Sequence, residues 1–200
     1  NAKWTGVRLR DVLARAGAQP SARHLQMLGA DRPVVATTPL FLRSIPIEKA
    51  LHPDTLLATH MNGAPLPLLH GAPLRLIGPG WMADACVKWL TELTVQEEEA
   101  KGYYMETAYR YPVRPVAPGT ALNPRDMKPV EAMVVKSLIA SPISGAALTL
   151  GPVSVEGVAW TGEGRVIMVE VSVDDGQTWE GARFVGEDAP YAWRQWQYIW

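Results

Sequence analysis

The sequence lacks any uninterrupted apolar run long enough to cross a bilayer. A transmembrane helix needs about 18–20 consecutive apolar residues, and every apolar run here is broken earlier by proline, glycine, a polar residue or a charge. We therefore expect no membrane span. The net charge of −1 over 200 residues also gives no excess of Lys and Arg with which to bind a phosphate backbone, so we expect no nucleic-acid partner.

Cysteine is nearly absent as well. Cys86 is the single cysteine, which excludes an internal disulfide and every zinc or iron–sulfur site that needs several thiolates. The chain also begins at Asn1 rather than at a methionine, and it ends at Trp200 within the aromatic run 191–200. From these ends we expect the 200 residues to be an internal fragment, with any targeting segment outside them.

Apolar spacing and turn residues predict an α+β first half. Apolar residues at helical spacing predict a helix over 7–16, and a proline in a first-turn position predicts a second helix over 44–51. Asn62-Gly63 lies between two apolar runs and predicts a tight hairpin turn. Short strands are expected over 75–77 and 87–95.

A proline-rich segment separates this half from a second half of different character. Five prolines fall in residues 112–129, which lack apolar periodicity and are typical of an extended connector. Beyond it, short β-rich runs alternate with turn residues at the spacing of a β-sandwich. The runs are 148–155, 158–160, 166–173, 179–185 and 192–199. We expect a first domain over 1–111, a connector over 112–129 and a β domain over 130–200.

Residues 61–89 carry the strongest chemical signal. His70, Arg75 and Lys88 lie among glycines and prolines, and Arg, Lys and close backbone approach are what a ligand ending in a phosphate requires. The three side chains are expected to converge on one cleft. From the residues alone, a solvated surface role for these cations stays open.

The same stretch resembles the molybdenum-cofactor domain of the sulfite oxidase family. The shared pattern is Met-Asn-Gly-x-Pro-Leu-Pro at 61–67, His-Gly-x-Pro-x-Arg at 70–75, Pro-Gly at 79–80 and Val-Lys-Trp at 87–89. The resemblance implies that His70, Arg75 and Lys88 hold the pyranopterin and its terminal phosphate. It also implies that Tyr109 lies beside the molybdenum, where its hydroxyl orients substrate oxygens; Tyr103, Tyr104 and Tyr111 are alternatives nearby.

Cys86 is the only residue that could supply a thiolate ligand for molybdenum in this chain. The family's thiolate ligand lies in a segment upstream of the Trp4-Thr5-Gly6-Val7 motif, which here stands at the beginning of the sequence. Cys86 is therefore expected to be a small buried residue and no metal ligand.

Two motifs in the second half, at 160–164 and 169–179, resemble the immunoglobulin-like dimerisation domain of the same family. The resemblance then covers nearly the whole chain and implies a molybdenum-dependent oxidation of sulfite to sulfate in a homodimer. No Cys-x-x-Cys-His haem motif occurs, so electrons would pass to a cytochrome in another domain or chain. A periplasmic location is expected if the source is bacterial. Sulfane or thiosulfate dehydrogenase, nitrate reductase and a catalytically silent dimerisation fragment are the alternatives.

Overall fold

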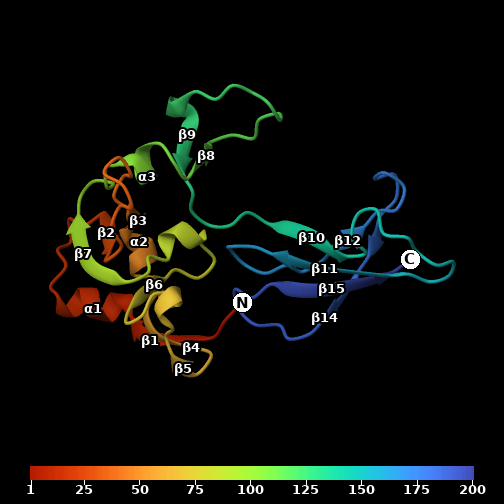
Figure 1. The fold of residues 1–200 in the computed structure, drawn as a ribbon, viewed down its shortest axis with the longest axis horizontal. Coiled ribbons are helices and arrows are strands. Elements are labelled where there is room, and N and C mark those ends of the chain that lie inside the picture. Colours follow the sequence, from red (N-terminus) through yellow and green to blue (C-terminus); the bar gives the residue numbers. More distant parts are fainter. The chain divides into compact units, whose positions relative to one another are not determined.

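A computed structural model describes all 200 residues, which divide into two compact units. One comprises Ala2–Glu131, and the other comprises Ala132–Trp200 with Asn1. Figure 1 shows that strands dominate both units and that the helices are short. No helix is long and apolar enough to cross a membrane.

Two antiparallel sheets form the frame of the first unit. In the first sheet, β4 (Leu56–Met61) pairs with β1 (Trp4–Arg8), β5 (Ala64–Pro65) and β6 (Arg75–Ile77). In the second sheet, β2 (His24–Gly29) lies between β3 (Leu42–Pro46) and β7 (Leu90–Gln96). Their apolar faces enclose one core, whose fully buried members include Leu9, Leu25, Met27, Ile45 and Leu76.

The Asn62-Gly63 hairpin was predicted correctly. Both residues have positive φ, 53° and 81°, which is the backbone that a two-residue turn between β4 and β5 requires. The predicted strand 75–77 is β6. The turn and its flanking strands fix where the following residues, 66–75, lie.

Both predicted helices are shorter than expected. The helix expected over 7–16 is α1 (Leu9–Arg15), because β1 continues to Arg8 in its pairing with β4. The helix expected over 44–51 is the single turn α2 (Ile47–Ala50), because β3 pairs with β2 as far as Pro46. In both places the strand partner overrides the local helical spacing.

The strand predicted over 87–95 begins three residues later, as β7 (Leu90–Gln96). Trp89 has a φ of 49°, which is incompatible with extended backbone. Lys88 and Trp89 therefore lie in a bend before the strand. Three one-turn helices lie between Leu68 and Glu106: η1 (Leu68–His70), η2 (Ala83–Ala85) and α3 (Tyr103–Glu106).

The proline-rich segment begins and ends in a two-stranded ribbon within the first unit. Strand β8 (Arg110–Pro112) pairs with β9 (Met127–Pro129), and the one-turn η3 (Pro124–Asp126) lies between them. Arg110 ties the ribbon down, because it donates hydrogen bonds to the carbonyls of Met105 and Met127. Figure 1 shows β8, β9 and their loop in green.

The second unit is entirely β-structure. Its main sheet has the order β10 (Lys136–Ser141), β11 (Ser154–Trp160), β15 (Arg194–Ile199), β14 (Arg183–Val185). A separate pair consists of β12 (Glu170–Val171) and β13 (Glu180–Gly181). The core is small, with Val155, Ala159, Val169 and Trp196 buried.

The sequence located most of this β-structure but not its exact bounds. The two runs expected at 148–155 and 158–160 are one strand, β11, since Gly157 continues it beneath the ring of Trp196. Strand β10 was not predicted. Its six residues are all exposed, so they do not show the alternation of a half-buried strand.

Candidate functional site

The one-turn helix η1 is held by three side chains from other elements. Gly71 follows it with a φ of 106°, a conformation that favours glycine. Three successive carbonyls of the turn then accept a hydrogen bond from a side chain. The donors are Trp89 Nε1 to Leu68 at 2.8 Å, Lys88 Nζ to Leu69 at 3.1 Å and Arg75 Nη1 to His70 at 2.8 Å. The structure therefore brings Arg75 and Lys88 together on the turn that carries His70.

Arg75 is the half-buried member of this cluster. Its Nη2 donates to the carbonyl of Cys86 at 3.2 Å, and its guanidinium lies 4.9 Å from the ring centroid of Trp4. Burial lowers its pKa from the usual arginine value. Its Nε is buried without a hydrogen-bond partner, so the side chain keeps an unused donor beside those that hold the turn.

Lys88 reaches the turn from the bend before β7. Its ammonium lies 4.3 Å from the ring centroid of Trp89, and two of its three donor positions remain beyond the bond to Leu69. A Cβ at Gly71 would come within 2.9 Å of Lys88 Cβ. Glycine therefore serves two needs at position 71, the positive φ and the close approach of the lysine.

The His70 side chain is exposed. His70 is the last residue of η1, and its carbonyl accepts the hydrogen bond from Arg75. An imidazole at this point can donate to or accept from a bound group. The three predicted cofactor residues thus share one turn, with one exposed imidazole and two cations.

Cys86 lies behind this turn and is partly buried. Its Sγ accepts a hydrogen bond from the Gly78 N–H at 3.4 Å, and burial raises the pKa of its thiol. No group of three or more His, Cys, Asp or Glu side chains in the chain is arranged to hold a metal ion.

Tyr109 lies in a second cluster of the same unit. Its ring is about half exposed and packs edge-on against Phe41, with the ring centroids 6.4 Å apart. The ring of Tyr104 lies 6.0 Å away, and the guanidinium of Arg43 is 5.6 Å from the Tyr109 centroid. Tyr109 has a φ of 52°. Among the candidate tyrosines, it is the one whose ring lies against a cation of the core.

Sequence reasoning missed the buried pair behind Tyr109. Arg43 on β3 and Asp84 on η2 form an ion pair at 2.5 Å, with 2% and 4% of their side chains exposed. Burial lowers the pKa of Arg43 and raises that of Asp84, and their mutual attraction opposes both shifts. A lone arginine and a distant aspartate form no recognisable spacing, so no signal in the sequence marks this pair.

The two clusters are joined through η2. Asp84 stands two residues before Cys86, whose carbonyl is held by Arg75, and four residues before Lys88. Asp31 is a further acidic residue that sequence reasoning missed. A Cβ at Gly29 would meet its carboxylate at 2.4 Å and the Lys88 carbonyl at 2.6 Å. The loop containing Asp31 therefore lies beside Lys88.

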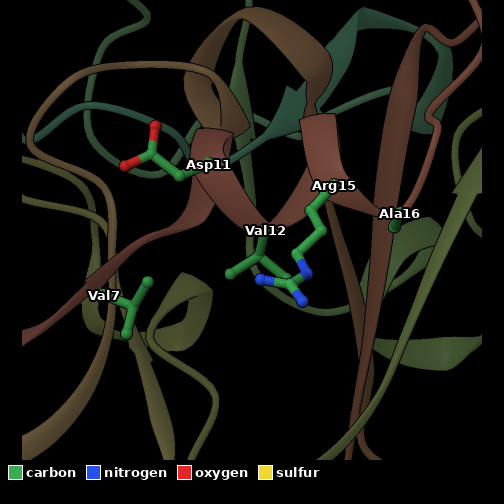
Figure 2. A pocket seen from close by; sticks show the side chains of 5 residues that line it. All are labelled: Val7, Asp11, Val12, Arg15 and Ala16. Atoms are coloured by element: carbon green, nitrogen blue, oxygen red, sulfur yellow. The ribbon is translucent and has the colours of Figure 1, made fainter.

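An open hollow beside β1 and α1 carries no comparable chemistry. Figure 2 shows it at the junction of β1 and α1, lined by Val7, Asp11, Val12, Arg15 and Ala16. The Arg15 side chain runs back toward Val12, whereas the Asp11 carboxylate points away. None of the predicted site residues lines it.

The donor set around η1 suits an anionic organic group. Two cations, an exposed imidazole, an unused buried donor on Arg75 and a glycine where a Cβ would collide with Lys88 meet at one turn. The chain thus has a first unit of sheets and short helices with a candidate anion site, followed by a unit whose regular elements are all strands. Residues 1–104 match the oxidoreductase molybdopterin binding domain family, and residues 127–200 match the Mo-co oxidoreductase dimerisation domain family.

The chain belongs to the sulfite oxidase family of molybdopterin-binding oxidoreductases. It is 38% identical over 206 residues to mitochondrial sulfite oxidase of Mus musculus, covering 98% of this chain and 37% of that protein. It is 34% identical over 193 residues to nitrate reductase [NADH] 2 of Phaseolus vulgaris, covering 88% of this chain and 22% of that protein. The chain thus spans about two fifths or less of the length of these relatives.

The fold matches a crystal structure of the sulfane dehydrogenase SoxCD from Paracoccus pantotrophus. The TM-score is 0.82 at 32% identity, over 100% of this chain and 48% of that one. The expected family is therefore confirmed, and the chain has a mostly β fold with few helices that matches this family, in place of the expected α+β balance. The roles of individual site residues stay predictions.

Proposed function

We propose that the chain forms part of a molybdenum-dependent oxidoreductase that oxidises sulfite to sulfate. The observation that carries this proposal is the meeting of Arg75 and Lys88 on the turn that bears His70. Both cations keep donors beyond these bonds, and donors on fixed cations favour an anionic partner. The family's molybdopterin cofactor ends in a phosphate, which is the partner this donor set fits.

In this proposal His70, Arg75 and Lys88 hold the pterin and its phosphate. Arg75 has its two terminal nitrogens committed to carbonyls at 2.8 and 3.2 Å, so it fixes the shape of the turn and offers its remaining N–H groups to the ligand. Lys88 supplies a point charge from a flexible stem. When bound, the molybdenum cofactor supplies the two-electron redox chemistry and oxygen transfer.

Tyr109 is proposed as the residue that touches substrate. Its ring is anchored by Phe41 and Arg43 while about half of the side chain stays exposed, which leaves the hydroxyl free to donate to a sulfite oxygen or to pass on a proton. The thiolate ligand of the metal is proposed to come from outside these 200 residues. Cys86 is a poor candidate, because its Sγ faces the Gly78 N–H and its thiol pKa is raised.

The proposed domains, oligomeric state, electron acceptor and location rest on the family. We propose a cofactor domain over 1–111, a connector over 112–129 and an immunoglobulin-like sandwich over 130–200 that forms a homodimer. The match of residues 127–200 to a dimerisation domain supports the last assignment. Electrons are proposed to leave singly to a cytochrome, and a periplasmic location fits a bacterial source.

Sulfane or thiosulfate oxidation is the second candidate, supported by the likeness to SoxCD over the whole chain. Nitrate reduction is a third, supported by the similarity to a nitrate reductase. A silent dimerisation fragment is the non-enzymatic alternative. A panel of sulfite, thiosulfate, a protein-bound sulfane and nitrate, assayed with one molybdenum-loaded preparation, separates all four.

The cofactor site is tested by Lys88→Gln and Arg75→Gln in the molybdenum-loaded full-length protein, because these 200 residues alone are expected to hold no molybdenum and to be inactive. Each substitution removes charge-assisted hydrogen bonds of about 1.5–3 kcal/mol, which corresponds to a loss of about tenfold or more in pterin affinity. Lys101→Gln is the matched control, because Lys101 is 79% exposed and pairs only with Glu98 at 3.6 Å. Pterin fluorescence and molybdenum content are measured after dialysis. Equal retention by Lys88→Gln, Arg75→Gln and the control would remove the cofactor site from this turn.

A further inference from the structure

Tyr109 has a backbone conformation that needs support from its surroundings. Its φ of 52° lies in the left-handed region, which bulky residues rarely adopt and which persists where neighbouring groups fix it. Its carbonyl accepts a hydrogen bond from the Val130 N–H at 2.8 Å. Its ring meets Phe41 and Tyr104 on the aromatic side. The guanidinium of Arg43 is the remaining group against the ring.

Arg43 is itself held at both terminal nitrogens. Nη1 donates to the carbonyl of Tyr104 in α3, and Nη2 pairs with Asp84 in η2. The arginine stem comes from β3, and 1% of the whole residue is exposed. A planar fork with two fixed partners has little freedom, so the position of the guanidinium under Tyr109 is determined by three separate elements.

We propose that Arg43, held by Asp84, is a positioning residue that sets the place of the Tyr109 ring relative to the cofactor turn. This inference rests on the function proposed above for Tyr109. Arg43 acts through the tyrosine and does not itself touch substrate or cofactor. Asp84 links Arg43 to the cofactor turn. Cys86 follows Asp84 by two residues, and the Cys86 carbonyl accepts a hydrogen bond from Arg75.

The Arg43–Asp84 pair thus connects two segments whose relative position matters for the proposed reaction. On one side, Arg43 reaches the segment that contains Tyr104 and Tyr109. On the other, Asp84 precedes the segment that contains Lys88. A displacement of either segment would move the tyrosine hydroxyl relative to the held cofactor, and displacements of about 1 Å can lower turnover by about 100-fold.

A purely stabilising ion pair is the plain alternative. Buried pairs can often be replaced by neutral side chains without loss of stability, so burial alone does not explain why a guanidinium stands at this point. The two interpretations differ in one respect. A stabilising pair acts on the whole unit, whereas a positioning pair acts on the Tyr109 ring even in a variant that is fully folded.

The experiment uses the double variant Arg43→Gln/Asp84→Asn in the molybdenum-loaded full-length protein. Both charges are removed together, so no unpaired charge is left in the core and the variant can fold. The matched control is Arg10→Gln/Asp11→Asn, which removes an exposed pair of the same unit at 3.6 Å. Circular dichroism verifies the fold of each preparation.

The first readout does not depend on the cofactor. The proteins are labelled with 3-fluorotyrosine, and the ¹⁹F resonance of Tyr109 is assigned by its loss in Tyr109→Phe. We expect one resonance in the unmodified protein and the control, and a shifted, broadened or split resonance in Arg43→Gln/Asp84→Asn. An unchanged Tyr109 resonance in the folded variant overturns the positioning role.

The second readout is steady-state turnover with sulfite. We expect kcat to fall about 10–100-fold in the double variant with molybdenum content unchanged, and adding Tyr109→Phe to it should cause little further loss. If Tyr109→Phe alone slows turnover and the double variant does not, the positioning role fails while the proposed function stands. If Tyr109→Phe leaves turnover unchanged, the proposed role of the tyrosine fails, and the ¹⁹F result alone decides whether Arg43 positions its ring.

Discussion

The two compact units use charged side chains in different ways. In Ala2–Glu131, Arg43 and Asp84 form an ion pair inside the core, and burial shifts both pKa values toward the neutral forms. In Ala132–Trp200, Asp174 is partly exposed and has a pKa of about 2, because Thr178 donates to its carboxylate from side chain and backbone and Ser172 adds a third bond. The first arrangement depends on exclusion of water, and the second depends on local hydrogen bonds.

The two units also differ in which segments their charged contacts connect. The buried pair and the cations around η1 link segments that are far apart in the sequence. The Asp174 contacts span at most four residues and close one turn. The second unit also has an ion pair between distant residues, Arg165 and Asp188, but both side chains are largely exposed, and its core is formed by Trp196 and its neighbours.

The largest expected effect tests the buried charge of the first unit. Arg43→Ala leaves the Asp84 carboxylate unpaired in the core, so we expect the free energy of unfolding to fall by about 3–5 kcal/mol. Arg10→Ala, at an exposed pair, should change it by no more than about 0.5 kcal/mol. Urea denaturation followed by circular dichroism measures both. A loss near that of the control would mean that Asp84 is already protonated in the folded protein.

A second substitution examines the packing on which the second unit depends. A Cβ at Gly157 would lie 2.2 Å from Trp196 Cζ2 and 2.3 Å from the Leu138 carbonyl oxygen. Gly157→Ala should therefore destabilise this unit by about 1–3 kcal/mol through overpacking.

Gly181→Ala is the matched control, since nothing lies within 4 Å of a Cβ there. Unfolding followed by the fluorescence of the tryptophans in the second unit distinguishes the two variants. If both behaved alike, Trp196 would not be the rigid centre of this unit.

The sequence predicted those parts of the fold that depend on local chemistry. Asn62-Gly63 specifies its own turn through positive φ, and the turn then positions β4 and β5. The start of α1 was misplaced because Trp4–Arg8 pairs with a strand some fifty residues away, which no local pattern records. Strand β10 was missed for the complementary reason, since an edge strand with every residue exposed has no apolar alternation.

The residues of the site also differ in whether the local sequence marks them. Arg75 and Lys88 were found because they occur in a continuous, turn-rich motif, and the structure brings both to η1. Their cofactor role stays a prediction, as does that of His70 and Tyr109. Arg43 and Asp84 were not found, because a buried ion pair is a property of the folded core and its two residues are ordinary surface types in the sequence.

A smaller effect is expected at Cys86, where the first unit buries an uncharged polar group. Cys86→Ala removes the acceptor for the Gly78 N–H and should cost about 1 kcal/mol. The raised thiol pKa should make the folded protein react slowly with iodoacetamide at pH 7, compared with the urea-unfolded chain.

The molybdenum-loaded full-length protein with Cys86→Ala should also keep its metal and most of its activity. Elemental analysis provides the check, with the unmodified protein as reference. Loss of molybdenum on substitution would identify Cys86 as the metal ligand and would contradict the alignment behind the proposed site.

The smallest expected effect concerns pH in the second unit. The folded pKa of Asp174, about 2, lies below its ordinary value of 3.8, so its contribution to stability is fully present above pH 3.8 and is lost as the pH falls toward 2. Asp174→Asn should remove this pH dependence and, at pH 7, the stabilisation that the carboxylate contributes there. Asp175→Asn is the control, since Asp175 lies in the same turn and none of the bonds from Ser172 and Thr178 reaches it. Thermal unfolding of the three proteins between pH 2 and pH 6 gives the comparison. If the unmodified protein and Asp174→Asn lost stability in parallel across this range, the carboxylate would not be held by its turn, and the contrast between the buried ion pair of the first unit and the locally hydrogen-bonded carboxylate of the second would be wrong.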